Sequence, residues 1–272
     1  MTSDERVRAS TAYKCGQFTE SISFCEQGIR SAQSNEQWDE CWLLRILHSL
    51  CLCAQGKFSE AVTLLEGPGS ADDVSVETRA RIQNQKAFAL SRHGKFAEAK
   101  DALEEALRLA ATQDARAVIA EIEINRSTLV FYLGKYDEVE DCARTALAIA
   151  GDLKLPMIEA SACAGLGKSY MYRERQAEAI PWFERALALY EKEGATSYAD
   201  IMRSELGCCH FALGESDKAS VYFIHALRVS RESGALAFFT LTLPIWVPCI
   251  FIAANFQKLS LTSKRHCKLR AI

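Results

Sequence analysis

The sequence predicts an all-α protein, a solenoid of six helix–turn–helix repeats that together span residues 1–234. A turn-like segment recurs six times at spacings of 40, 38, 40, 40 and 40 residues. After each turn, apolar residues recur at helical spacing, as Ala179, Phe183 and Ala186 do. Self-similarity at a fixed period of this size indicates a repeat array. The turns are centred near Gly16, Gly56, Gly94, Gly134, Glu174 and Gly214.

Glycine occupies the centre of five of the six turns. Because glycine adopts the left-handed backbone conformation without a steric penalty, it suits a point where one helix ends and the chain reverses. In four turns an aromatic residue follows two positions after the centre, and begins the next helix. These residues are Phe18, Phe58, Phe96 and Tyr136.

The segments before the turns are helical too, and two of them carry the same Leu-Gly pair. The pair is Leu166-Gly167 in the fifth repeat and Leu206-Gly207 in the sixth. We expect these glycines to let a neighbouring helix approach closely. The second repeat departs from the pattern, since Gly67-Pro68-Gly69 should end its second helix early.

With these features the chain resembles the tetratricopeptide repeat (TPR) family, in a long-loop form with a period of about 40 residues instead of 34. The resemblance covers nearly all of residues 1–234, although the family's proline after the second helix is absent. It implies a right-handed superhelix whose first helices line a concave groove. The residues that carry it are Leu166, Gly167, Tyr170, Ala179, Phe183 and Ala186, then Leu206, Gly207, Ala219, Phe223 and Ala226, with Ala99 and Ala106.

The same resemblance implies which side chains face the groove. They are a mixture of amides, aromatic residues and bases, which suits an extended peptide whose backbone, side chains and acids each find a partner. We therefore expect a non-enzymatic protein–protein interaction scaffold. The expected groove residues are Arg81, Asn84, Gln85, Phe88, Arg92, Asn125, Thr128, Phe131, Tyr132, Lys168, Met171 and Tyr172.

Composition narrows the remaining classes of function. The net charge is −3, but residues 235–272 hold five bases and no acid, so residues 1–234 carry 27 bases against 35 acids and a charge of −8. An acidic body gives no reason to expect a nucleic-acid partner. The eleven cysteines and five histidines lack metal-ligand spacing, and the first ten residues lack the apolar core of a secretory signal. We expect a cytoplasmic protein without a metal, a cofactor or a catalytic motif.

The tail, residues 235–272, does not continue the repeats. Residues 235–256 include no charged side chain over 22 positions, as in a membrane span. The alternative is a seventh repeat in a shifted reading frame. If the frame is displaced by one base, each new codon consists of the last base of one codon and the first two bases of the next. The final G of the Trp246 codon, TGG, and the GT that begins the Val247 codon then form GGT, which encodes glycine at the position where the repeat requires one. His266 followed by the TG of Cys267 likewise gives the expected leucine.

We therefore expect the tail to be a frame-shifted seventh repeat. Two other functions remain open. The chain could be the sensor or regulatory arm of a larger enzyme or transcription regulator whose effector domain is missing, or a membrane adaptor anchored by its tail. The second of these is disfavoured, because the positive-inside tendency would keep the basic tail in the cytoplasm and move the cysteine-rich body across the membrane.

Overall fold

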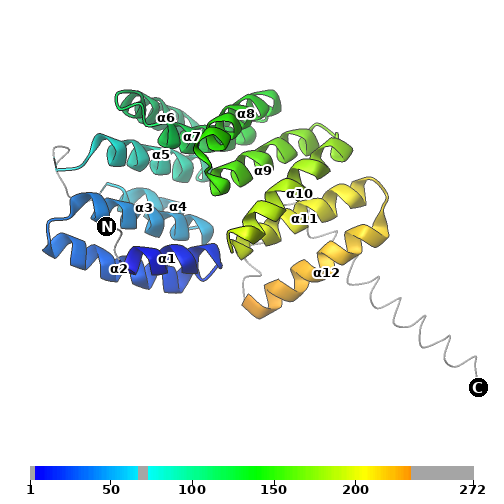
Figure 1. Ribbon diagram of the computed structural model, residues 1–272, viewed down its shortest axis with the longest axis horizontal. Helices are drawn as coiled ribbons and strands as arrows, with labels where there is room; N and C mark the ends of the chain where they lie inside the picture. Colours follow the sequence, from blue (N-terminus) through cyan, green and yellow to red (C-terminus); the bar gives the residue numbers. More distant parts are fainter. Residues whose placement is uncertain (1–3, 67–72, 234–272) are drawn as a thin grey trace, which may run out of the picture. The chain divides into compact units, whose positions relative to one another are not determined.

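The structure is a computed structural model that describes residues 4–66 and 73–233, and this part of the chain is formed by helices, turns and loops (Figure 1). It divides into two compact units, Met1–Met202 and Arg203–Ile272. The helices are α1 Asp4–Lys14, α2 Phe18–Ser34, α3 Trp38–Ala54, α4 Phe58–Leu64, α5 Val76–Arg92, α6 Phe96–Ala111, α7 Arg116–Tyr132, α8 Tyr136–Leu153, α9 Pro156–Tyr172, α10 Gln176–Lys192, α11 Thr196–Ala212 and α12 Ser216–Ser233.

These helices form six successive pairs, which confirms the predicted all-α repeat fold. The chain reverses within each pair at a residue with positive φ, as a left-handed turn requires. Five of these residues are glycine, and the fifth repeat uses Glu174 at φ 60°. The glycines are Gly16, Gly56, Gly94, Gly134 and Gly214, and their φ angles are 78°, 78°, 82°, 73° and 77° in that order.

Within the first compact unit, each helix packs against its neighbours in the sequence, and the first helices of successive repeats also touch. Helix α3 contacts α5, α5 contacts α7 and α7 contacts α9. The first helices therefore lie side by side through the second to fifth repeats. Their adjacent sides form one continuous layer.

Small residues allow the helices to pack this closely. Ala99 and Ala106 on α6 and Ala179 and Ala186 on α10 have no exposed surface. At Gly167 an added Cβ would lie 2.6 Å from the ring of Phe183 in the partner helix, and at Gly207 it would lie 2.7 Å from the ring of Phe223. The expectation that these glycines permit a close approach is confirmed.

The second repeat is shortened as the sequence predicts. Its second helix, α4, has 7 residues, whereas α6 has 16 and α8 has 18. Beyond it, Leu65 and Val74 pack with Trp42 of α3 and Ile82 of α5. Residues 67–72, which include the Gly-Pro-Gly sequence, lie outside the described part.

The last helix presents apolar side chains to solvent. Val221 is 67% exposed and Ile224 is 43% exposed. Within residues 4–66 and 73–233, no helix is both long and apolar enough to cross a membrane. The tail lies outside the described residues, so both its assignment as a seventh repeat and the alternative membrane span stay predictions.

Candidate interaction surface

The twelve predicted groove residues lie on the first helices α5, α7 and α9. On α7, Asn125, Thr128 and Tyr132 are three and four residues apart, so they share one face of that helix. Lys168 and Tyr172 are related in the same way on α9. Helices α5, α7 and α9 pack side by side, so the predicted residues are distributed over three adjacent repeats.

The amides among these residues form hydrogen bonds to the neighbouring first helices. The Gln85 side chain donates a hydrogen bond to Ser49 Oγ on α3 at 3.1 Å, and Asn125 Nδ2 donates to Asn84 Oδ1 at 2.9 Å. Asn84 is 5% exposed and Gln85 is 3% exposed. A buried amide is costly unless it has a partner, and here the neighbouring first helix supplies one. These amides therefore hold adjacent repeats in register.

The two predicted arginines on α5, Arg81 and Arg92, are also engaged within the protein. Arg81 Nη1 lies 2.6 Å from Glu77 Oε1, and Arg81 Nε lies 3.2 Å from Glu121 Oε2 on α7. The guanidinium carbon of Arg92 lies 5.5 Å from the centre of the Phe58 ring, a cation–π contact with α4. The charge of Arg81 is balanced by two carboxylates, so Arg81 supports the packing of α5 against α7.

Two other predicted residues, Phe88 and Thr128, also have defined local contacts. Phe88 packs against the cluster of Leu52, Cys53, Ala61 and Ala89. Thr128 Oγ1 donates to the backbone carbonyl of Ile124 on its own helix at 3.2 Å. Lys168 and Met171 are half-buried on α9.

The aromatic residues form a continuous group, here called the aromatic cluster, which consists of Phe96, Phe131, Tyr132, Tyr136 and Tyr172. Phe131 and Tyr172 meet edge to face with ring centres 4.8 Å apart. Tyr136 lies 5.5 Å from Tyr172, and Tyr132 stacks on Phe96 at 6.5 Å. These separations fall within or near the range in which aromatic pairs attract one another. The cluster joins α6, α7, α8 and α9.

Solvent reaches the cluster at the end of α7. Tyr132 is 42% exposed, and Leu133, which follows it, is 46% exposed. Large apolar side chains seldom gather at an exposed turn without a role, although a single exposed one is ordinary. The aromatic part of the predicted surface is thus accessible, whereas its amides are bonded inside the protein.

Two members of the aromatic cluster, Phe96 and Tyr136, are absent from the predicted set. Each begins a second helix two residues after a turn glycine, and each packs on the last residue of the following first helix, Tyr132 and Tyr172 respectively. Both pairs are separated by 36 residues. The recurrent aromatic residue after the turn was the signal that could have placed them in the site.

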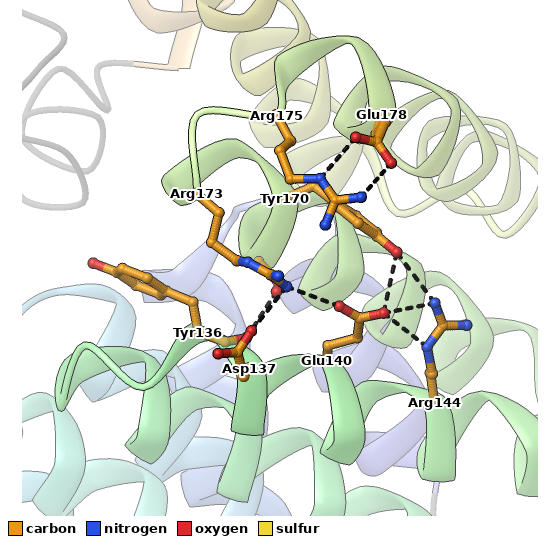
Figure 2. A network of polar contacts seen from close by, with 9 residues as sticks. Tyr136, Asp137, Glu140, Arg144, Tyr170, Arg173, Arg175 and Glu178 are labelled. Carbon is orange, nitrogen blue, oxygen red and sulfur yellow. Dashed lines mark hydrogen bonds and ion pairs between the residues drawn. The ribbon is translucent and has the colours of Figure 1, made fainter.

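A polar network lies next to the cluster and joins α8 to α9, with Glu140 at its centre (Figure 2). Glu140 Oε1 accepts hydrogen bonds from Arg144 Nη2 at 2.7 Å and from the Tyr170 hydroxyl at 3.1 Å, and Oε2 accepts one from Arg173 at 3.0 Å. Arg144 Nη2 also donates to the Tyr170 hydroxyl at 3.1 Å. The hydrogen bonds from Arg144, followed by those from Tyr170, hold the pKa of the Glu140 carboxyl below its usual range.

Arginines continue the network into the turn before α10. Arg173 also lies 3.0 Å from Asp137 Oδ1, and the guanidinium of Arg175 lies 4.7 Å from the centre of the Tyr170 ring. Figure 2 shows the ring of Tyr136 pointing away from these charged groups. The network therefore fixes α8 against α9, the two helices that carry Tyr136 and Tyr172.

A histidine of the sixth repeat also has a structural partner. His210, which is 7% exposed, lies with Nδ1 2.6 Å from Glu215 Oε2 in the second compact unit. Among the residues with described positions, no three His, Cys, Asp or Glu side chains gather as a metal site would require.

Several solved structures share this fold at low sequence identity. BtubC (BKLC) from P. vanneervenii is 19% identical, with a TM-score of 0.56, over 78% of this chain and 91% of that one. A Rap protein complexed with Competence and Sporulation Factor is 13% identical with a TM-score of 0.63, over 88% and 70% of the two chains.

A STAND protein with a tetratricopeptide repeat sensor, from Pyrococcus horikoshii, is 16% identical with a TM-score of 0.63. The match covers 84% of this chain but 34% of that protein. These likenesses establish the tetratricopeptide repeat fold, and the resemblance seen in the sequence is confirmed.

No curated protein matches the sequence. Residues 48–222, however, match the family described as the suppressor of spindle checkpoint defect 1 C-terminal domain. The match begins within α3 and ends within α12, so it contains the whole candidate surface and more than half of the chain. The chain therefore belongs to the suppressor of spindle checkpoint defect 1 C-terminal domain family.

Proposed function

We propose that this protein is a non-enzymatic interaction scaffold which binds an extended segment of a partner protein across the ends of α7 and α9. The observation that carries the proposal is the aromatic cluster, whose rings form a contiguous group and whose member Tyr132 is 42% exposed. Tyrosine is enriched where protein interfaces gain most of their binding energy, because one ring buries a large area and offers a hydroxyl.

The neighbouring contacts support this function. The bonded amides join α5 to α7 and the Glu140 network joins α8 to α9, so helices that carry the cluster are held in place before a partner arrives. Preorganisation of this kind lowers the entropic cost of binding. Among solved relatives of the fold, the Rap protein was crystallised with Competence and Sporulation Factor. For this chain we propose a protein or peptide ligand with an apolar anchor, in a reducing compartment that keeps the cysteines free.

A selection experiment tests the proposal. A phage-displayed library of random 12-residue peptides is selected against the full chain, and the affinity of the strongest binder is measured by fluorescence anisotropy. Tyr132→Ala should weaken binding at least about tenfold, since loss of an interface tyrosine costs on the order of 1–2 kcal/mol. The matched control is Leu153→Ala, because Leu153 is 39% exposed at the end of α8. Equal affinity for wild type and Tyr132→Ala would refute the site.

A second function is favoured by one observation. The STAND protein carries a tetratricopeptide repeat sensor as part of a longer chain, and this chain spans about a third of it. We propose as the alternative that the repeats here are the sensor arm of a larger regulatory protein. Sequencing the gene beyond the tail, in the restored frame, separates the two: an effector domain supports the alternative, and an early stop codon supports the scaffold.

A further inference from the structure

The start of α11 touches the end of α1, although the two are separated by more than four repeats. The hydroxyls of Tyr13 and Tyr198 lie 2.8 Å apart, close enough to hydrogen-bond, and their rings meet edge to face with centres 6.1 Å apart. Ser197 Oγ also donates to the backbone carbonyl of Lys14 at 2.9 Å. All of these residues belong to the first compact unit, so the contact joins the two ends of that unit.

Other aromatic side chains extend this contact on both sides. Tyr198 stacks on Tyr190 of α10 with ring centres 5.1 Å apart, and Tyr13 lies 5.8 Å from Phe18 of α2. The Tyr190 hydroxyl lies 3.0 Å from Ser161 Oγ on α9. Four rings, those of Phe18, Tyr13, Tyr198 and Tyr190, thus lie in a row. Within this row, the Tyr13–Tyr198 pair is the contact that joins the two ends of the unit.

The contact between Tyr13 and Tyr198 differs from the other contacts between repeats. Successive repeats are joined by whole helices packed along their length, whereas Tyr13 and Tyr198 are 185 residues apart and meet through ring edges and hydroxyls. Both residues keep some exposed surface, whereas burial raises the pKa of both hydroxyls, so water would take over their hydrogen bonds only when the rings separate. A contact of this type can open without unfolding the repeats that it joins.

We propose that the Tyr13–Tyr198 pair, with Ser197, is a releasable clasp that holds the ends of residues 4–202 together. The clasp closes the array on itself, and its release lets the first helices change their curvature while each helix pair stays folded. A repeat array with a closed and an open arrangement is a two-state element whose equilibrium a partner can shift. The clasp goes beyond the proposed binding site and does not depend on it.

Hydrogen exchange of the full chain, measured without any ligand, tests the clasp. Tyr13→Phe and Tyr198→Phe each remove one hydroxyl and keep the ring. Either variant should increase exchange about tenfold at the last turn of α1 and the first turn of α11 together, the effect of losing one hydrogen bond. The helices α5 to α8 should exchange as in the wild type.

Tyr190→Phe is the matched control. It removes a tyrosine hydroxyl bond of similar length, to Ser161, that lies between the adjacent helices α9 and α10. It should increase exchange there and leave α1 unchanged. If Tyr198→Phe left exchange at α1 unchanged, or if it increased exchange equally along the whole chain, the clasp would be refuted.

A second measurement covers the case in which one substitution destabilises the fold. Ser197→Ala removes the bond to the Lys14 carbonyl and leaves both tyrosines in place. Small-angle X-ray scattering of Tyr13→Phe combined with Ser197→Ala should show a larger radius of gyration than the wild type, with an unchanged helical circular dichroism spectrum. An unchanged radius of gyration would overturn the proposal.

Discussion

Cys25 and Cys53 lie in the interior of the first two repeats, with 0% and 3% of their surface exposed. Burial raises the pKa of each thiol to about 12. Cys51, between them in space, donates a hydrogen bond from its thiol to Ser21 Oγ at 3.2 Å. The thiols act as small apolar side chains that fill the gaps between helices, because ionising them would place a charge where water cannot reach it.

This burial sets the direction of a pH dependence. The folded-state pKa of Cys25 is raised, so the thiol's contribution to stability is complete below the unfolded pKa of about 8.5 and is lost as pH rises toward 12. Between pH 9 and 11, urea unfolding should show the Cys25→Ala variant losing stability less steeply than the wild type, by about 1.4 kcal/mol per pH unit. Cys15→Ala, at an exposed thiol, is the control. Identical slopes for all three proteins would contradict the burial of Cys25.

The ring of Phe183 leaves no room for a side chain at Gly167. An added methyl group would lie 2.6 Å from that ring, so we expect Gly167→Ala to lower the free energy of unfolding by about 1–3 kcal/mol. Gly151, on α8, has no atom within 4 Å of the same position, and Gly151→Ala should be neutral or stabilising by up to about 1 kcal/mol. Thermal melts of the two variants decide this. Equal losses in the two variants would contradict the tight packing of Gly167 against Phe183.

At the scale of the helix pair, the turn of the fifth repeat departs from the others. Glu174 has φ 60°, a conformation that costs a non-glycine residue free energy, whereas the other five turns use glycine. Glu174→Gly should therefore raise the free energy of unfolding by about 0.5–1 kcal/mol in urea denaturation. Gly134→Ala is the reciprocal test: it has φ 73° and open space around the Cβ position, and should lose a similar amount. A loss of stability in Glu174→Gly would contradict this reading of the turn.

The helix pairs are also where prediction from sequence succeeded. Turn glycines located the ends of the first helices, and Gly67-Pro68-Gly69 predicted the shortness of α4. The Leu-Gly pairs predicted the close approach of a neighbouring helix, which the structure shows at Phe183 and Phe223. Each of these features depends on local backbone chemistry, which a short stretch of sequence determines.

Contacts between distant helices were beyond the same reasoning. The bond from Asn125 to Asn84 joins residues 41 apart, and the pair Tyr13 and Tyr198 joins residues 185 apart. Whether such side chains meet depends on the rotation between successive repeats, and the period of the sequence does not determine that rotation. For this reason the sequence identified amides on the first helices but did not reveal that they are hydrogen-bonded to the neighbouring first helices.

The exposed side chains of Val221 and Ile224 allow a prediction about the tail, residues 235–272. An apolar face at the end of a repeat array is stabilised by a further repeat or by a polar cap. A chain carrying the restored seventh repeat should melt at a higher temperature than residues 1–234 alone, because each added interface stabilises such an array. Expression of the natural chain, residues 1–234 and the restored chain allows thermal melts and membrane fractionation to be compared. Alkali-resistant recovery of the natural chain in membranes would instead establish the tail as an anchor.

Binding of a partner segment where the first helices α7 and α9 end can be tested by hydrogen exchange of the full chain, with and without the peptide selected from the random 12-residue library. We predict that bound peptide slows exchange at residues 125–136 and 168–173, around Tyr132 and Tyr172, and leaves the middle of α6 and α10 unchanged. Slowed exchange confined to the second helices, with residues 125–136 unaffected, would contradict it.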